Sequence, residues 1–276
     1  MALDLRQLTR APLTGAQMNE PENANTFTPT LTAALSDAIA EAEADPEVRV
    51  LVLTGTGKVF SAGGNAVGMS GGGSGGGQRN KAAAPTGPRV AAHAMTESSI
   101  GASAGRTTVR LREMPKPTIA ALNGGVGGGG LSWACAADVR IAAASAKFAT
   151  GFINVGLSID YGASYFLPRL VGESTARELF FTGRKFDAAE AQRIGLVSRV
   201  LPDDELMGAV EELAEEMAEK APTALASMKR NLNDNVDNDL EDAIKVEAMR
   251  IGPLLGGAEN KEAATAFLEK RPPNFE

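Results

Sequence analysis

The sequence predicts an α/β fold in which a sheet-containing core, residues 1–200, is followed by a helical region, residues 201–276. The first observation is that short runs rich in β-branched residues alternate with helical patterns in the core, which is typical of α/β layering. The second is that residues 203–269 contain helical patterns without a strand-like run between them. Because a few helices alone leave apolar faces uncovered, we expect this region to dock on the core or on a neighbouring subunit.

Residues 28–44 form the first predicted helix. Pro29 stands near its first turn, where the missing N–H has no intrahelical partner to lose, and apolar residues recur at helical spacing after it. Short apolar runs predict strands at residues 48–53, 118–122, 138–142 and 196–200. Further helices are predicted at residues 204–220, 222–233, 239–250 and 260–269.

Composition and charge exclude several classes of protein. The chain has 27 Lys and Arg against 34 Asp and Glu, a net charge of −7, which disfavours nucleic-acid binding. A single cysteine, Cys135, and a single histidine, His93, exclude an internal disulfide, a CxxC motif and a multi-histidine metal site. No apolar run is long enough to span a membrane, and the first residues lack a signal-peptide core. We therefore expect a cytoplasmic protein with no membrane partner and a small-molecule ligand.

Glycine is concentrated in two windows with different settings. Residues 68–77 mix Gly with Ser and predict a flexible surface loop. Residues 124–130 lie between apolar segments, which indicates backbone packed closely against another part of the chain, with a helix opening at Leu131. The GxGxxG match at residues 125–130 lacks an acidic residue closing the next strand, since Asp138 begins that strand, so a dinucleotide site is disfavoured.

Two glycine-bearing turns suggest a shared chemistry. Residues 60–64 follow the first strong strand after a short loop, and residues 127–130 follow another strand and open a helix. Free N–H groups at a helix N-terminus attract an oxyanion, and two such donors aimed at one carbonyl would stabilise a thioester enolate. Two ordinary tight turns are the alternative. His93, with Glu97 one helical turn later, is either a general base or a structural residue.

Five motifs occur in order along nearly the whole chain. They are residues 21–25 (PENAN), 60–64 (FSAGG), 117–130 with Asp138, 179–197, and 267–275 (FLEKRPPNF). Together they resemble the motifs of the enoyl-CoA hydratase/isomerase family, the crotonase superfamily. The resemblance implies an α/β, crotonase-like spiral of ββα units over residues 1–200 and a C-terminal helical trimerisation region over residues 201–276.

The resemblance also implies a substrate and an assembly. The substrate is an acyl-CoA thioester, with coenzyme A as part of the substrate and with no separate cofactor or metal, and the chain forms a homotrimer or a dimer of trimers. By position, the backbone N–H groups of Gly64 and Gly129 match the oxyanion hole. The positions matching CoA contacts are Glu22 and Ala24 in the pocket, and Phe267 and Lys270 in a tail that reaches across a subunit boundary.

Two positions depart from the family pattern. Ser132 and Phe152 stand where hydratases carry glutamates, so ordinary hydration of an enoyl-CoA is not expected. A simple enoyl-CoA isomerase is disfavoured too, because the resemblance places its lone base at Phe152. Asp160 stands where related isomerases and dehalogenases keep an aspartate, and we expect it to act as an acid or base on the acyl group. The alternative is that Asp160 caps a helix beginning at Tyr161.

Other interpretations stay open at this point. The chain is either an enzyme or a non-catalytic acyl-CoA-binding protein that kept the oxyanion hole, and thioester hydrolysis and C–C cleavage are further reactions for the same scaffold. Residues 68–88 predict a lid over the acyl pocket that orders when ligand binds. His93, Glu97 and Glu113 are candidates to enter the site from the segment that follows this lid.

Overall fold

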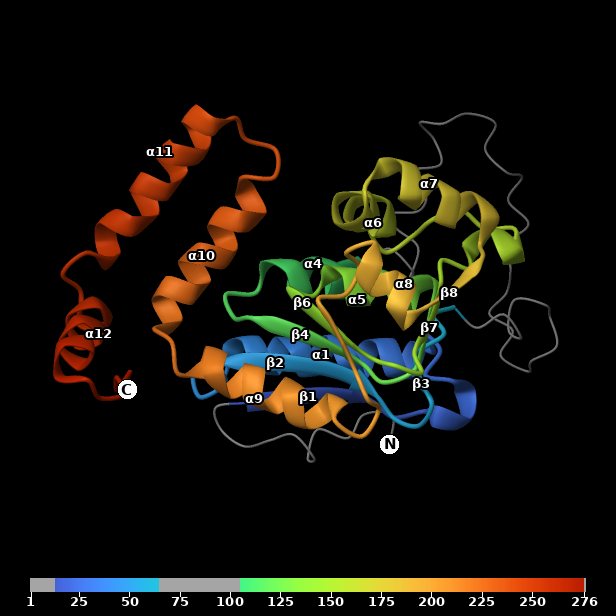
Figure 1. The fold of residues 1–276 in the computed structure, drawn as a ribbon, viewed down its shortest axis with the longest axis horizontal. Coiled ribbons are helices and arrows are strands. Elements are labelled where there is room, and N and C mark those ends of the chain that lie inside the picture. Colours follow the sequence, from blue (N-terminus) through green and yellow to red (C-terminus); the bar gives the residue numbers. More distant parts are fainter. Residues whose placement is uncertain (1–12, 65–104, 276) are drawn as a thin grey trace.

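Two sheets form the centre of the structure (Figure 1), a computed structural model that describes residues 13–64 and 105–275. The strands are β1 (Leu13–Met18), β2 (Val50–Gly55), β3 (Val59–Ser61), β4 (Thr118–Leu122), β5 (Gly125–Gly127), β6 (Val139–Ala143), β7 (Lys147–Ala149), β8 (Lys185–Asp187) and β9 (Arg199–Leu201). The first sheet, in the order β1-β2-β4-β6-β9, is parallel throughout. The second has the order β3-β5-β7-β8, and its β7–β8 pair is antiparallel.

The helices follow strands in a repeating pattern. They are η1 (Pro21–Asn23), α1 (Pro29–Ala44), α4 (Gly105–Glu113), α5 (Gly128–Ala136), η3 (Phe152–Val155), α6 (Ala163–Val171), α7 (Glu173–Thr182), α8 (Ala188–Arg193), α9 (Leu206–Ala218), α10 (Pro222–Asp234), α11 (Leu240–Ile251), η4 (Gly252–Leu254) and α12 (Ala258–Glu269). β4, β5 and α5 form one unit, and β6, β7 and α6 form the next, with one strand of each unit in each sheet. This arrangement confirms the expected spiral of ββα units.

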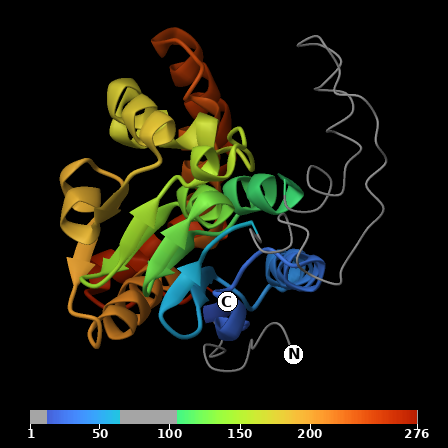
Figure 2. The ribbon, with the colours of Figure 1, turned by 90° about the vertical axis from the view of Figure 1, so that its right-hand side faces the viewer.

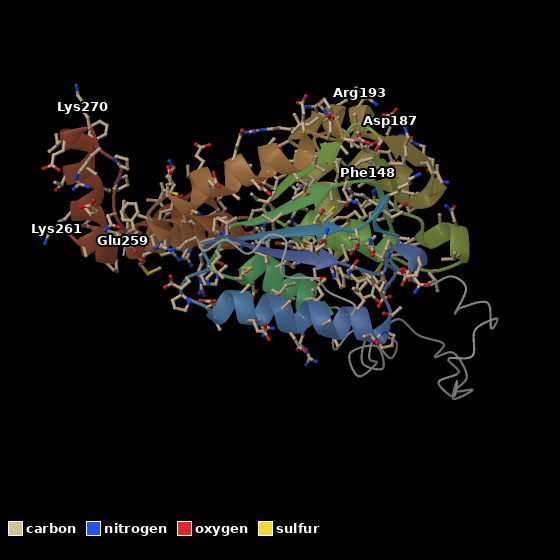
Figure 3. The ribbon with its side chains drawn as sticks, turned by 90° about the horizontal axis from the view of Figure 1, so that it is seen from below. Phe148, Asp187, Arg193, Glu259, Lys261 and Lys270 are labelled. Carbon is tan, nitrogen blue, oxygen red and sulfur yellow. The ribbon has the colours of Figure 1, made fainter. Side chains whose placement is uncertain are left out.

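The sheets lie between helices on both sides. α1 begins where the sequence predicts, because Thr28 is its N-cap and accepts a hydrogen bond from the Leu31 N–H at 3.0 Å. Strand β2 is buried along its whole length, as expected for a parallel strand that is covered on both faces. Figure 2 shows α1 and α4 on one side of the strands and the orange α9 on the other, and Figure 3 shows the same separation of α1 from α9.

One predicted strand, residues 196–200, is shorter than expected. The run 196–200 pairs with β6 only from Arg199 onward. Gly195, with a φ of 81°, follows the end of α8, and Leu196 and Val197 then fill the core from a loop.

The expected loop 68–77, the lid 68–88, His93 and Glu97 lie outside the described residues.

The helical region starts with a helix that belongs to the core. Leu206, Val210 and Ala214 of α9 are buried in a second apolar cluster together with Val52 and Ile119 of the first sheet. α10, α11 and α12 instead project away from the sheets (Figure 1). Within residues 13–64 and 105–275, no helix is both long and apolar enough to cross a membrane.

A buried ion pair fixes α10 to the core. Lys229 Nζ lies 2.8 Å from Asp138 Oδ2, and the Lys229 side chain is only 8% exposed. The same ammonium group donates to the carbonyl oxygens of Leu111 and Lys116. Asp138 Oδ2 also accepts from the N–H and the hydroxyl of Thr118. Asp138 therefore joins the beginnings of β4 and β6 to the helical region.

Replacing Lys229 with methionine should lower the free energy of unfolding by about 3–5 kcal/mol, because the Asp138 carboxylate then stays in the protein without its cation. Urea unfolding followed by circular dichroism measures the change. Lys261, an exposed lysine on α12, provides the control, and Lys261→Met should change the value by less than about 0.5 kcal/mol. A loss below about 1 kcal/mol for Lys229→Met would show that this pair behaves like an ordinary surface ion pair.

Candidate active site

The turn after β3 is held by hydrogen bonds to the segment before α1. Ser61 Oγ donates to the Asn25 carbonyl at 2.7 Å and accepts from the Gly63 N–H at 3.1 Å. The Phe27 N–H donates to the Gly63 carbonyl at 2.7 Å. Gly63 has a φ of 75°, a left-handed conformation that a side chain would strain. The backbone of Gly64, the first expected oxyanion donor, therefore follows a turn that is fixed on both sides.

The PENAN motif has a structural explanation in its last residue. Asn25 is fully buried, and its side-chain amide donates to the carbonyl oxygens of Thr56 and Val59 at 3.1 and 2.7 Å. Its Oδ1 accepts from the Glu20 N–H at 2.9 Å. An asparagine is needed here because one side chain must both donate and accept. The motif thus fastens the segment before α1 to the β2–β3 connection.

Two residues of this segment were expected to line a CoA pocket. Glu22 lies in η1 and is exposed. Ala24 has a φ of 53°, and its carbonyl accepts from the Ala62 N–H at 3.0 Å. Ala24 is therefore bonded directly to the turn that carries Gly64, whereas the Glu22 side chain extends into solvent.

The second glycine window forms the first turn of a helix rather than a loop before it. α5 begins at Gly128, three residues earlier than the predicted start at Leu131. Its first N–H groups have no intrahelical acceptor, so the positive end of the helix dipole is open there. A Cβ on Gly130 would lie 2.4 Å from the Ser61 carbonyl, and a Cβ on Gly63 would lie 2.5 Å from the Gly129 nitrogen. The two predicted turns are therefore in direct contact, which only glycine permits.

Two aromatic rings close over Gly129 from the other side. A Cβ on Gly129 would come within 2.4 Å of Phe27 Cε2 and 2.7 Å of Tyr161 Cδ2. Phe27 stacks on the buried Trp133, with ring centroids 3.8 Å apart, and meets Tyr161 edge to face at 5.2 Å. No role in the site was predicted from the sequence for Phe27 or for the Tyr161 ring. Both are adjacent to residues that the sequence singled out, but adjacency does not tell which surface an aromatic ring covers.

Asp160 is bonded to α5 through its backbone, because its carbonyl oxygen accepts a hydrogen bond from Ser132 Oγ. Its Oδ1 is buried and has no hydrogen-bond partner among the described residues. Burial raises the pKa of Asp160 from 3.8 to about 6, since the charged form loses its hydration. The expected alternative, a capping role, is wrong: α6 begins at Ala163, its N-cap is Gly162, and no side chain caps it. A carboxyl group whose pKa is raised by burial is a candidate functional group.

The two positions at which the resemblance places the hydratase glutamates hold the uncharged Ser132, within α5, and Phe152, next to its start. Ser132 is buried, and its Oγ lies 3.2 Å from the Asp160 carbonyl oxygen and 3.4 Å from that of Gly128. Phe152 is buried as well, and its Cε1 would lie 3.9 Å from a Cβ on Gly128. Neither side chain accepts a proton at neutral pH.

Three other candidates are not brought to this site within one chain. Phe267 on α12 is 83% exposed, and Lys270 ends the same helix. Figure 3 shows Lys270 at the opposite end of the molecule from Phe148 on β7, the strand that pairs with β5 just before α5. Glu113 is exposed at the end of α4 and lines a separate cavity of about 930 Å³ beside α10.

Comparisons with known proteins identify the family and the fold of this chain. The family model described as enoyl-CoA hydratase/isomerase matches residues 10–87 and 89–276. Crotonyl-CoA hydratase of Syntrophomonas wolfei is 33% identical over 259 residues, which is 94% of this chain and 92% of the relative. 1,2-Epoxyphenylacetyl-CoA isomerase of Escherichia coli is 32% identical over 264 residues, again 94% and 92%. The crystal structure of an enoyl-CoA hydratase from Polaromonas sp. JS666 superposes with a TM-score of 0.86 at 31% identity and covers both chains completely.

Proposed function

This chain belongs to the enoyl-CoA hydratase/isomerase family, and from that premise we propose that it isomerises an acyl-CoA thioester through an enolate, with Asp160 moving the proton. The observation that carries the proposal is that Asp160 Oδ1 is buried without a hydrogen-bond partner among the described residues, while the Asp160 carbonyl is bonded to Ser132 of α5. Family membership supports an acyl-CoA substrate, and one of the relatives is named as an isomerase.

The proposed mechanism needs two amides and one acid. The N–H groups of Gly64 and Gly129 bind the thioester oxygen, and the open end of α5 adds its dipole. The bound carbonyl makes a proton on Cα or Cγ of the acyl group acidic. Asp160 takes this proton, negative charge moves onto the thioester oxygen, and Asp160 returns the proton to the other carbon of the conjugated system. The double bond moves, and no water is consumed.

Hydration is the less favoured reaction at this site. Addition of water requires groups that activate the water and protonate the acyl carbon, and the family's hydratases use two glutamates for this. Ser132 and Phe152 occupy those positions here, and Ser132 Oγ is engaged with backbone carbonyl oxygens. Asp160 is a single acid–base group, which is sufficient to move one proton from one carbon to another.

The proposal is tested by incubating the full chain with 2-enoyl-, 3-enoyl- and dienoyl-CoA thioesters in D₂O. Isomerisation with Asp160 as shuttle predicts a moved double bond, detected by NMR of the product and lost in Asp160→Asn. A product without deuterium would mean that Asp160 returned the same proton, and deuterium at Cα or Cγ, detected by mass spectrometry, would mean that the Asp160 carboxyl exchanged with solvent before returning it. Hydration of crotonyl-CoA at rates usual for the family would contradict it. Free thiol release would indicate thioester hydrolysis, a shortened acyl chain would indicate C–C cleavage, and tight binding without turnover would indicate a non-catalytic binder.

The rate should depend on pH through Asp160. Burial raises the pKa of this carboxyl to about 6, so the basic form predominates above that pH and the neutral acid below it. Because the ionised form takes the first proton, kcat/KM should be constant above about pH 7 and fall by about tenfold per pH unit below pH 6. Initial rates between pH 4.5 and about 8.5 in buffers of constant ionic strength measure the profile. A rate that rises on acidification would assign the first step to the protonated acid.

We also propose that the protein is a homotrimer or a dimer of trimers in which the tail of one chain reaches the site of another. The large exposed side chains Leu240 and Phe267, 78% and 83% exposed, support this because such surfaces are usually covered. Phe267 and Lys270 would then contact CoA held beside Ala24 and Glu22 of the neighbouring chain. Sedimentation velocity tests the assembly, and a monomer at working concentration would contradict it.

A further inference from the structure

We propose that Tyr161 is a positioning residue for Asp160: its left-handed backbone sets the direction of the chain at Asp160, and its ring shields the carboxylate from water. The inference rests on the function proposed for Asp160. Tyr161 has a φ of 50°, which a bulky residue adopts only where its surroundings enforce it. Backbone strain of this kind is concentrated at functional sites.

Two helices hold the backbone of this segment in place. The Asp160 carbonyl accepts from Ser132 Oγ of α5 at 3.2 Å. The next carbonyl, that of Tyr161, accepts from Thr108 Oγ1 of α4 at 3.2 Å. Consecutive carbonyl groups are thus tied to side chains of two different helices, and the left-handed turn at Tyr161 connects them. Ser132, at a position where the family's hydratases carry a glutamate, therefore helps to hold the backbone of Asp160 in place.

The Tyr161 ring lies against the oxyanion turn. It covers Gly129, where a Cβ would lie 2.7 Å from Tyr161 Cδ2, and it packs edge to face on Phe27. Burial and the nearby Asp160 charge raise the pKa of the Tyr161 phenol to about 12. The phenol therefore stays neutral wherever Asp160 titrates and cannot replace it as the base. Its contribution is apolar surface and fixed geometry.

Charged neighbours do not explain the titration of Asp160. The ionisable side chains on the packed elements α4, α5 and α6 are Arg106, Arg110, Arg112, Glu113, Cys135, Tyr165 and Arg169. None of them contributes to the raised pKa of Asp160, whose cause is burial. If the Tyr161 ring supplies part of that burial, as proposed, removing the ring should lower the pKa of the Asp160 carboxyl toward its ordinary value.

The test is a pH titration of protein labelled with ¹³C at the aspartate carboxyl groups, followed by NMR. The Asp160→Asn variant assigns the Asp160 signal. In the unmodified protein the midpoint should be close to 6, and Tyr161→Phe, which keeps the ring, should leave it there. In Tyr161→Gly, which tolerates the left-handed backbone but lacks the ring, the midpoint should fall toward 3.8. Tyr161→Asn, which also tolerates this conformation, should behave like Tyr161→Gly.

Kinetics and a matched control separate positioning from folding. Tyr161→Gly should lower kcat by about tenfold or more with little change in KM, and the acidic limb of its pH profile should move to lower pH. Tyr165→Ala removes an aromatic ring from α6 that lies against Arg169 instead of Gly129, and it should leave the Asp160 titration unchanged. An Asp160 midpoint that stays near 6 in folded Tyr161→Gly and Tyr161→Asn would overturn the inference. The incubation with acyl-CoA thioesters in D₂O decides the proposed function separately, because the NMR titration needs no ligand.

Discussion

Asp160→Asn should remove nearly all turnover while making the folded protein more stable at neutral pH. The amide has the size of the carboxylate but cannot accept the substrate proton, so kcat should fall by about 10²–10⁴-fold. Binding of an acyl-CoA thioester should persist, because the proposed oxyanion donors are backbone groups of Gly64 and Gly129. Steady-state kinetics with the substrate found in the D₂O experiment, together with calorimetry, measure the two effects independently.

The stability gain follows from the direction of the pKa change. The carboxyl has a pKa of about 6 when folded and close to 3.8 when unfolded, so the folded state binds more protons between these values. The contribution of Asp160 to stability is therefore lost as pH rises from about 4 to 6, and above pH 6 the unpaired charge is fully destabilising. Removing that charge should add on the order of 1 kcal/mol at pH 7, because the group is only partly shielded from solvent.

Urea unfolding at pH 7 and again at pH 4 measures this gain, which should shrink at the lower pH where the wild-type carboxyl is protonated. Asp204→Asn is the matched control, because Asp204 is exposed, and it should change neither the rate nor the pH dependence of stability. Turnover of Asp160→Asn within a few-fold of wild type would remove this residue from the mechanism. A loss of stability at pH 7 would show that Asp160 is paired in the folded protein.

Gly129→Ala should damage both catalysis and folding, because the structure leaves no room for a methyl group at this position. The new Cβ would lie 2.4 Å from Phe27 Cε2, so either the ring or the start of α5 must move. Moving the helix start displaces the N–H group proposed to bind the thioester oxygen, and kcat should fall by about 10²–10³-fold. Overpacking of this kind should also lower the free energy of unfolding by about 1–3 kcal/mol.

Gly208→Ala provides the matched control for this experiment. Gly208 lies inside α9 and has nothing within 4 Å of an added Cβ, so alanine there should stabilise the protein by about 0.5–1 kcal/mol without changing the rate. Rates are compared at a temperature where circular dichroism shows both variants folded. A Gly129→Ala enzyme with wild-type kcat would mean that the oxyanion site does not depend on the start of α5.

The local sequence patterns predicted most helices and strands because capping, fixed φ angles and side-chain spacing act over only a few residues. Thr28 and Pro29 fix the start of α1 through capping and a preset φ, and residues 118–122 form β4 without any shift. The start of α5 was predicted three residues too late, because a run of glycines has low intrinsic helix propensity. A tertiary contact overrides that preference here. Residue 130 must be glycine because α5 approaches Ser61 at this point, and a glycine can still adopt the helical conformation.

Order and spacing of the motifs were sufficient, on their own, to establish the ββα spiral and the family, since turns and buried strands require particular residues at particular distances along the chain. Packing between distant segments decided the rest. It left Asp160 Oδ1 without a partner within residues 13–64 and 105–275, placed the rings of Phe27 and Tyr161 over Gly129, and paired Lys229 with Asp138. Residue periodicity shows which face of an element is buried, but the neighbours of that face depend on how the elements pack together.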